Sequence, residues 1–115
     1  MKKIIVFATA ILALAACKQE NNDMLKEKVE SYAVVEVTSP LYDALSENDK
    51  KIVGLFRQAA EIMDGLFWKQ TFGDKSEMEA LTDEYAKAYA MINYGPWDHL
   101  DNNAPFIEGY GEKPL

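Results

Sequence analysis

The sequence is poor in the residues on which metal and redox sites depend. Its 115 residues include one cysteine and one histidine. A single cysteine excludes an internal disulfide, and a single histidine excludes any zinc motif that needs two histidines from one chain. Asp98 and Asp101 lie near His99, but three such residues in a loop are more typical of turns and solvated surface groups. The sequence therefore predicts no catalytic residue, no metal ligand and no cofactor in this chain.

Basic residues are also scarce, with 12 lysines and arginines against 19 aspartates and glutamates. Nucleic acid and anionic lipid are both bound through clustered lysine and arginine side chains. The charge balance therefore excludes nucleic acid as a partner and excludes adhesion to a membrane by charge alone. A phosphate-binding glycine loop is missing too, because the Gly109-x-Gly111 pair is not followed by a helix start.

Long hydrophobic runs are absent apart from one at the amino terminus, over residues 4–16. As a helix this run would reach about 20 Å, which is short of a hydrocarbon core of roughly 30 Å. Lys2 and Lys3 precede the run, and small residues end it, as is typical of a secretory signal. The sequence therefore predicts a signal peptide over residues 1–16.

The signal ends in Leu14-Ala15-Ala16-Cys17, which resembles the lipobox of bacterial lipoproteins. This resemblance implies acylation of Cys17 and cleavage before it, and two or more acyl chains make a stable anchor. An ordinary signal with a chance cysteine is the alternative. The lipobox reading predicts that a bacterial membrane is the partner and that the protein is lipid-anchored in the cell envelope, facing the periplasm or the surface.

The rest of the chain divides into a tether and one small domain. Residues 17–31 hold the acylated cysteine and a polar stretch, which we interpret as a tether with at most a nascent helical turn. Residues 32–115 form the domain. Within it, the β-branched segment 32–37 predicts one short strand, ended by Ser39-Pro40.

Two amphipathic helices dominate the predicted domain. Ser46 can cap the first, and apolar residues then recur at three- and four-residue spacing over residues 46–69. Ser76 and Glu79 form a capping box that predicts a second helix over residues 76–93. We expect the two helices to pack through their apolar stripes. The fold class is mostly α with a short β segment (α+β).

A rough energy balance indicates that the domain is incomplete. Seven apolar side chains buried from the first helix would gain roughly 10–20 kcal/mol. Ordering that helix costs about 35 kcal/mol at about 1.5 kcal/mol per residue. The second helix and one strand offer little surface to close this gap, so residues 32–115 are expected to be the incomplete amino-terminal part of a larger domain.

The carboxyl-terminal stretch, residues 93–115, is rich in glycine, proline and aromatic residues and has no regular period. Large aromatic side chains in loops often line pockets or interfaces, although plain packing remains the alternative. Here the candidate cleft or packing loop consists of Asn93, Tyr94, Trp97 and Asp98.

Two stretches resemble a known enzyme family. The first stretch is residues 59–64 (Ala-Ala-Glu-Ile-Met-Asp), running on to Phe67-Trp68-Lys69-Gln70. The second is residues 92–101 (Ile-Asn-Tyr-Gly-Pro-Trp-Asp-His-Leu-Asp), followed by Pro105-Phe106-Ile107 and Gly109. Both are similar to the early region of bacterial, Bacteroidetes-like dipeptidyl peptidase III-type zinc metallopeptidases. His99 stands where the family pattern has an arginine.

The resemblance implies a two-lobed α+β peptidase of several hundred residues that releases dipeptides from peptide amino termini. Its zinc would be held by a His-Glu-x-x-Gly-His helix and a later glutamate, none of which can be placed on this sequence. We therefore expect an inactive amino-terminal fragment of such an enzyme, with the zinc and the peptide substrate belonging to the full-length protein. The alternatives are a stand-alone small envelope lipoprotein that binds a peptide or protein, and a structural lipoprotein without a ligand.

Overall fold

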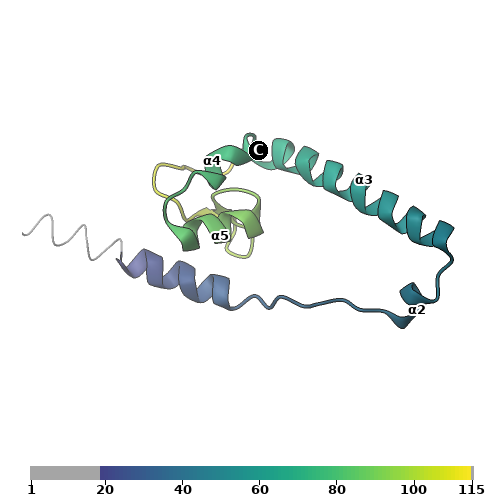
Figure 1. Ribbon diagram of the computed structural model, residues 1–115. Helices are drawn as coiled ribbons and strands as arrows, with labels where there is room; N and C mark the ends of the chain where they lie inside the picture. The colour runs from purple at the N-terminus through teal and green to yellow at the C-terminus, as the bar shows by residue number, and fades with distance from the viewer. Residues whose placement is uncertain (1–18, 115) are drawn as a thin grey trace, which may run out of the picture.

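The computed structural model describes residues 19–114, which form a compact end with a long helix projecting from it (Figure 1). The fold is mostly α with one short two-stranded antiparallel sheet, as the sequence predicts. The predicted signal peptide and Cys17 lie outside the described residues. After a helix over residues 19–30, the elements are α2 (Pro40–Asp43), α3 (Glu47–Thr71), α4 (Lys75–Glu79), α5 (Glu84–Asn93), β1 (Trp97–Asp98) and β2 (Ala104–Pro105).

The helix over residues 19–30 corrects the expected tether. It is a regular helix whose Leu25 is fully buried in the core. Its first turn also contacts the start of α5, because the side-chain amide of Asn22 donates to Asp83 at 2.7 Å. One leucine and a few polar contacts thus dock a mostly polar helix onto the core. The composition of this segment alone does not indicate the docking.

Residues 33–39 run extended but form no strand, so the strand predicted over residues 32–37 is wrong. Val34, Val35 and Val37 are all exposed. β-Branched residues favour extended backbone, but a strand needs a neighbour to accept its hydrogen bonds, and the described sheet pairs only β1 with β2. The chain then turns through the short helix α2 into α3.

Helix α3 confirms the first predicted helix almost to its ends. The Ser46 hydroxyl oxygen accepts a hydrogen bond from the Asp49 amide at 3.2 Å, which caps the first turn. The helix ends at Phe72, and Gly73 follows with a φ of 127°. Only Trp68, near the carboxyl end, is buried. Most of this 25-residue helix therefore extends away from the core.

The second predicted helix is divided into α4 and α5. Asp74, rather than Ser76, caps α4, and its carboxylate accepts from the Ser76 amide at 2.9 Å. Asp83 then caps α5, accepting from the Tyr85 and Ala86 amides at 3.0 Å each. A second good cap restarts the helix in a new direction, so the single helix over residues 76–93 is wrong.

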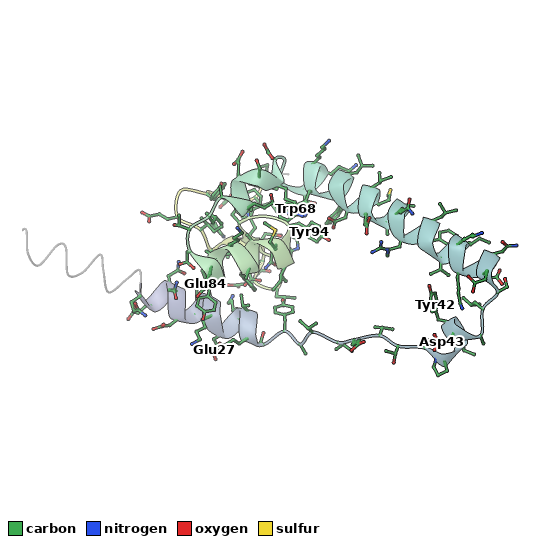
Figure 2. All side chains as sticks on the ribbon, viewed as in Figure 1. Glu27, Tyr42, Asp43, Trp68, Glu84 and Tyr94 are labelled. Atoms are coloured by element: carbon green, nitrogen blue, oxygen red, sulfur yellow. The ribbon has the colours of Figure 1, made fainter. Side chains whose placement is uncertain are left out.

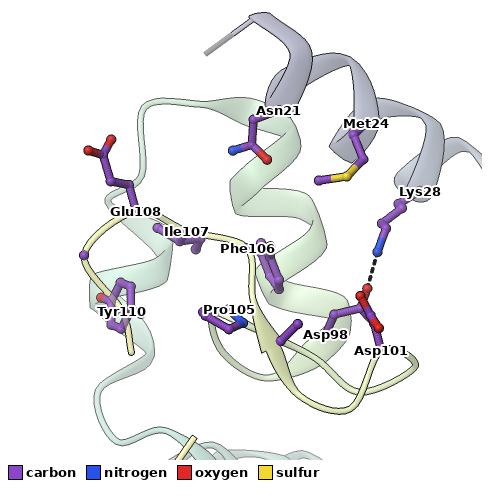
Figure 3. A pocket seen from close by; sticks show the side chains of 12 residues that line it. Asn21, Met24, Lys28, Asp98, Asp101, Pro105, Phe106, Ile107, Glu108 and Tyr110 are labelled. Atoms are coloured by element: carbon purple, nitrogen blue, oxygen red, sulfur yellow. Dashed lines mark hydrogen bonds and ion pairs between the residues drawn. The ribbon is translucent and has the colours of Figure 1, made fainter. Parts of the chain in front are cut away.

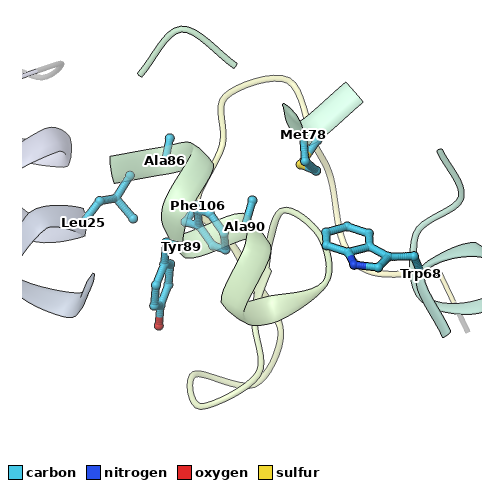
Figure 4. Packing of buried hydrophobic residues seen from close by; sticks show 7 residues of the cluster. All are labelled: Leu25, Trp68, Met78, Ala86, Tyr89, Ala90 and Phe106. Carbon is cyan, nitrogen blue, oxygen red and sulfur yellow. The ribbon is translucent and has the colours of Figure 1, made fainter. Parts of the chain in front are cut away.

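The core lies between the helix over residues 19–30, α5, and the end of α3 (Figure 4). The expected packing of α3 against the second helix through shared apolar stripes is wrong, because Leu55 remains 63% exposed. No helix of the described residues is long and apolar enough to cross a membrane. The buried apolar cluster comprises Leu25, Trp68, Met78, Ala86, Tyr89, Ala90 and Phe106.

Candidate functional site

The candidate loop begins where α5 ends in a left-handed turn. Tyr94 has a φ of 54° and Gly95 a φ of 145°. Buried Asn93 holds the turn from inside: its amide nitrogen donates to the Tyr89 carbonyl, and its amide oxygen accepts from the His99 backbone amide, both at 3.1 Å. Asn93 therefore acts as a brace between α5 and the loop.

Replacing Gly95 with alanine should destabilise this turn. An added Cβ would lie 3.3 Å from the Cβ of Phe72, and the φ of 145° is one that side-chain-bearing residues rarely adopt. We expect a loss of about 1–3 kcal/mol in the free energy of unfolding, measured by urea denaturation. Gly111 is the matched control, because its added Cβ meets nothing within 4 Å. Equal stability of the two alanine variants would contradict the strained turn.

Trp97 and Tyr94 are packing residues. The Trp97 indole nitrogen donates to the Gly111 carbonyl at 2.8 Å, and its ring lies edge-on to Phe72 with centroids 5.9 Å apart. Tyr94 packs edge-on against Phe67 at 4.7 Å, and its hydroxyl donates to Asp64 at 2.6 Å. The sequence analysis leaves two roles open for this loop, lining a cleft or packing against the core. The contacts favour packing for both Trp97 and Tyr94.

Asp98 is the most enclosed charged group of the loop. Only 2% of it is exposed, and it forms an ion pair with Lys28 from the helix over residues 19–30 (Figure 3). Its other carboxylate oxygen accepts from the Leu100 backbone amide at 2.9 Å. The Lys28 ammonium also lies 5.5 Å from the centre of the Tyr89 ring. Asp98 thus joins the amino-terminal helix to the β1–β2 ribbon.

The surroundings of Asp98 favour its charged form. Burial raises the pKa of Asp98, but hydrogen bonds from Lys28, Leu100 and Tyr89 outweigh this and hold the pKa below its ordinary 3.8. The hydrogen bond to Asp98 in turn raises the pKa of Lys28 above its ordinary 10.5, despite partial burial. Both groups are therefore charged across the physiological range, and the pair is structural rather than a proton donor or acceptor.

A pocket of about 420 Å³ opens beside this ion pair, between the helix over residues 19–30 and the segment after β2 (Figure 3). Of the four loop candidates only Asp98 lines it; Asn93, Tyr94 and Trp97 lie elsewhere. Sequence analysis missed Lys28 and Met24 on the pocket wall, because their helix was interpreted as a tether. Their spacing of four residues on one helical face is the signal that would have indicated a docked helix.

His99 takes no part in a metal cluster within residues 19–114, where no group of three or more histidine, cysteine, aspartate or glutamate side chains is placed to hold a metal ion. Its Nε2 atom lies 3.0 Å from the Lys113 Nζ atom. Partial burial, followed by this nearby ammonium, lowers the pKa of His99 below its ordinary 6.5. Asp98 and Asp101 lie close in sequence but have separate roles: Asp98 is buried against Lys28, whereas Asp101 is exposed.

Comparison with known proteins identifies one similar protein. The chain is 32% identical over 92 residues to Nudix hydrolase 3 of Arabidopsis thaliana. The match covers 72% of this chain but only 12% of that relative, so the chain spans about an eighth of its length. No family model matches the chain, and no solved structure matches it either.

This similarity overturns the expected resemblance to dipeptidyl peptidase III. The relative that matches most of this chain is named a Nudix hydrolase, so the expected membership of the dipeptidyl peptidase III family and the expected peptidase function are both wrong. The name belongs to a much longer protein, and the shared part is a small fraction of it. The activity of the whole relative is therefore not an observation about this chain.

Proposed function

We propose that this chain is a non-catalytic structural segment of a hydrolase-type protein similar to Nudix hydrolase 3. The observation that carries the proposal is the similarity over 72% of this chain, confined to 12% of the relative. A segment that occupies so small a part of a long protein need not contain its reactive groups, and it can instead serve the packing of the whole protein.

The chemistry of the candidate loop supports a structural role. Asn93 braces a turn, Trp97 donates to a backbone carbonyl, and Asp98 is held by Lys28. Each polar group is already occupied by a contact that positions the chain.

A chimera tests this proposal. The aligned segment of Nudix hydrolase 3 is replaced by the matching residues of this chain, and the thermal midpoint and hydrolase turnover are measured. We expect a cooperatively folded chimera whose turnover stays within about ten-fold of the parent, equivalent to about 1.4 kcal/mol in the barrier. This chain by itself should give no turnover on the same substrate.

The matched control carries a glycine–serine linker of equal length in place of the segment, and it should melt well below the chimera. Two results would contradict a structural role: turnover by the chain alone, or a linker variant as stable as the chimera. Acylation of Cys17 and the envelope location stay predictions, since residue 17 lies outside the described part of the chain.

A further inference from the structure

Helix α3 carries a broad apolar face that stands clear of the core. Phe56 and Ile62 on this face are 71% and 68% exposed. At about 100° of rotation per residue, its apolar side chains fall on one continuous arc of about 180°. Exposed apolar patches of this kind mark interaction sites rather than ordinary surface. The α3 apolar face comprises Ile52, Val53, Leu55, Phe56, Ala59, Ile62, Met63 and Leu66.

The compact end of the protein contacts α3 near the carboxyl end of the helix. Three residues of α3 contact Tyr94 there: Trp68 lies close to the middle of the arc opposite the apolar face, Asp64 near one edge of that face, and Phe67 on the face itself. Figure 2 shows Trp68 and Tyr94 together at the carboxyl end of α3, with the rest of the helix extending away from them. The apolar face therefore remains available along the preceding turns.

The breadth of the α3 apolar face indicates how many elements are needed to cover it. A two-helix seam uses one narrow stripe of apolar positions, whereas a helix packed into a domain buries an arc of 100° or more. An arc of about 180° is too broad for one partner helix, since a second helix contacts only one side of the cylinder. At least two elements are needed, with α3 lying in the groove between them.

Charges at the edge of the face add a second feature. Lys51 and Lys69 are 18 residues apart, which places both on the same edge of α3, five turns apart. Both side chains are exposed, and neither forms an ion pair with another of the described residues 19–114. The rim of the covering groove along this edge should therefore be acidic.

We propose that α3 docks in an apolar groove with an acidic rim, formed by the remaining part of the larger hydrolase. This inference rests on the proposed function and names the partner of its structural segment. The relative is long enough to contain such a groove, because 88% of its length lies outside the matched part. In the chain alone the middle of α3 is a single helix without tertiary contacts, and such helices are marginal in water.

Hydrogen exchange on the full chain and on the chimera tests the proposal. In the chain alone, amides over residues 50–65 should exchange at least about ten-fold faster than those of α5, because unpacked helices open readily. In the chimera the same α3 amides should become protected. Leu55→Asp should lower the folded-to-unfolded ratio of the chimera about a hundred-fold or more, because it buries an unpaired charge. The same change should leave the stability of the chain alone nearly unaltered.

Gly54→Asp is the matched control, since it adds the same charge near the middle of the polar side of α3, where an added Cβ meets nothing within 4 Å. It should be tolerated in both proteins. Tolerance of Leu55→Asp by a folded chimera would overturn the docking while leaving the proposed function standing. A chimera that fails to fold even with the unaltered segment would instead refute the proposed function. Sedimentation of the chain alone as a dimer with protected α3 amides would show that a second copy covers the face.

Discussion

Replacing Trp68 with alanine is expected to unfold the compact end and release α3 from it. Trp68 is only 3% exposed and is the one buried residue of α3. Its ring lies 5.1 Å from that of Tyr94, and the Lys75 ammonium lies 5.6 Å from its centre. Removing a buried tryptophan costs about 3–5 kcal/mol. A small domain with a total stability near 5 kcal/mol would lose most of its folded population.

Near-ultraviolet circular dichroism during urea denaturation measures this loss. Phe56→Ala is the matched control, because it removes an equally apolar ring from the same helix at a position that is 71% exposed. Its effect on the chain alone should stay within about 0.5 kcal/mol, as for other surface substitutions. Similar midpoints for the two variants would mean that Trp68 is not the attachment point of α3.

Replacing Asp98 with asparagine is the second large expected effect. The change keeps an acceptor for the Leu100 amide but leaves Lys28 without its counter-charge. Loss of one partner of a fully buried pair costs about 3–5 kcal/mol. The Lys28 side chain is 33% exposed, so solvent screening reduces the expected loss to about 1–3 kcal/mol. Asp101→Asn, at an exposed position in the same loop, should change the unfolding midpoint little.

The contribution of Asp98 should depend on pH in a defined direction. Because the folded pKa of Asp98 lies below the ordinary 3.8, its charged form stabilises the fold at pH values above 3.8. This stabilisation is lost as the pH falls through the folded pKa. The stability difference between the wild type and Asp98→Asn should therefore be full at pH 6 and shrink below pH 3.8. A difference that grew on acidification would contradict a charged Asp98.

Local signals in the sequence predicted α3 well and the other elements less well. The cap at Ser46 and the regular apolar spacing are both short-range features, so the bounds of α3 follow from them. The second helix is divided because Asp83 caps a new start at α5, and the sequence analysis did not recognise this cap inside the regular apolar spacing of residues 76–93. The strands are two residues each and are set by a contact between Trp97 and Pro105, so they leave no periodic pattern to read.

The candidate loop stays a prediction from the sequence, and the sequence did not indicate the residue that pairs with its Asp98. Asn93 accepts a hydrogen bond from the His99 backbone amide, whereas Trp97 packs against Phe72 and Asp98 pairs with Lys28. Lys28 was missed because it is 70 residues from Asp98 in sequence. The spacing of Met24 and Lys28 can indicate that a helix docks there, but no local pattern identifies residues so far along the chain as its partners.

The docked helix over residues 19–30 changes how far this protein can stand from an anchor at Cys17. A flexible tether of 13 residues would have an end-to-end distance of about 20 Å, so the domain could move that far from the anchor. The chain is instead already helical at residue 19, the first residue that the structure describes, two positions after Cys17. Two residues span at most about 7 Å, so an acylated Cys17 would hold the compact end directly at the lipid surface. The anchor would then restrict orientation as well as distance, and one side of the protein would face the headgroups permanently.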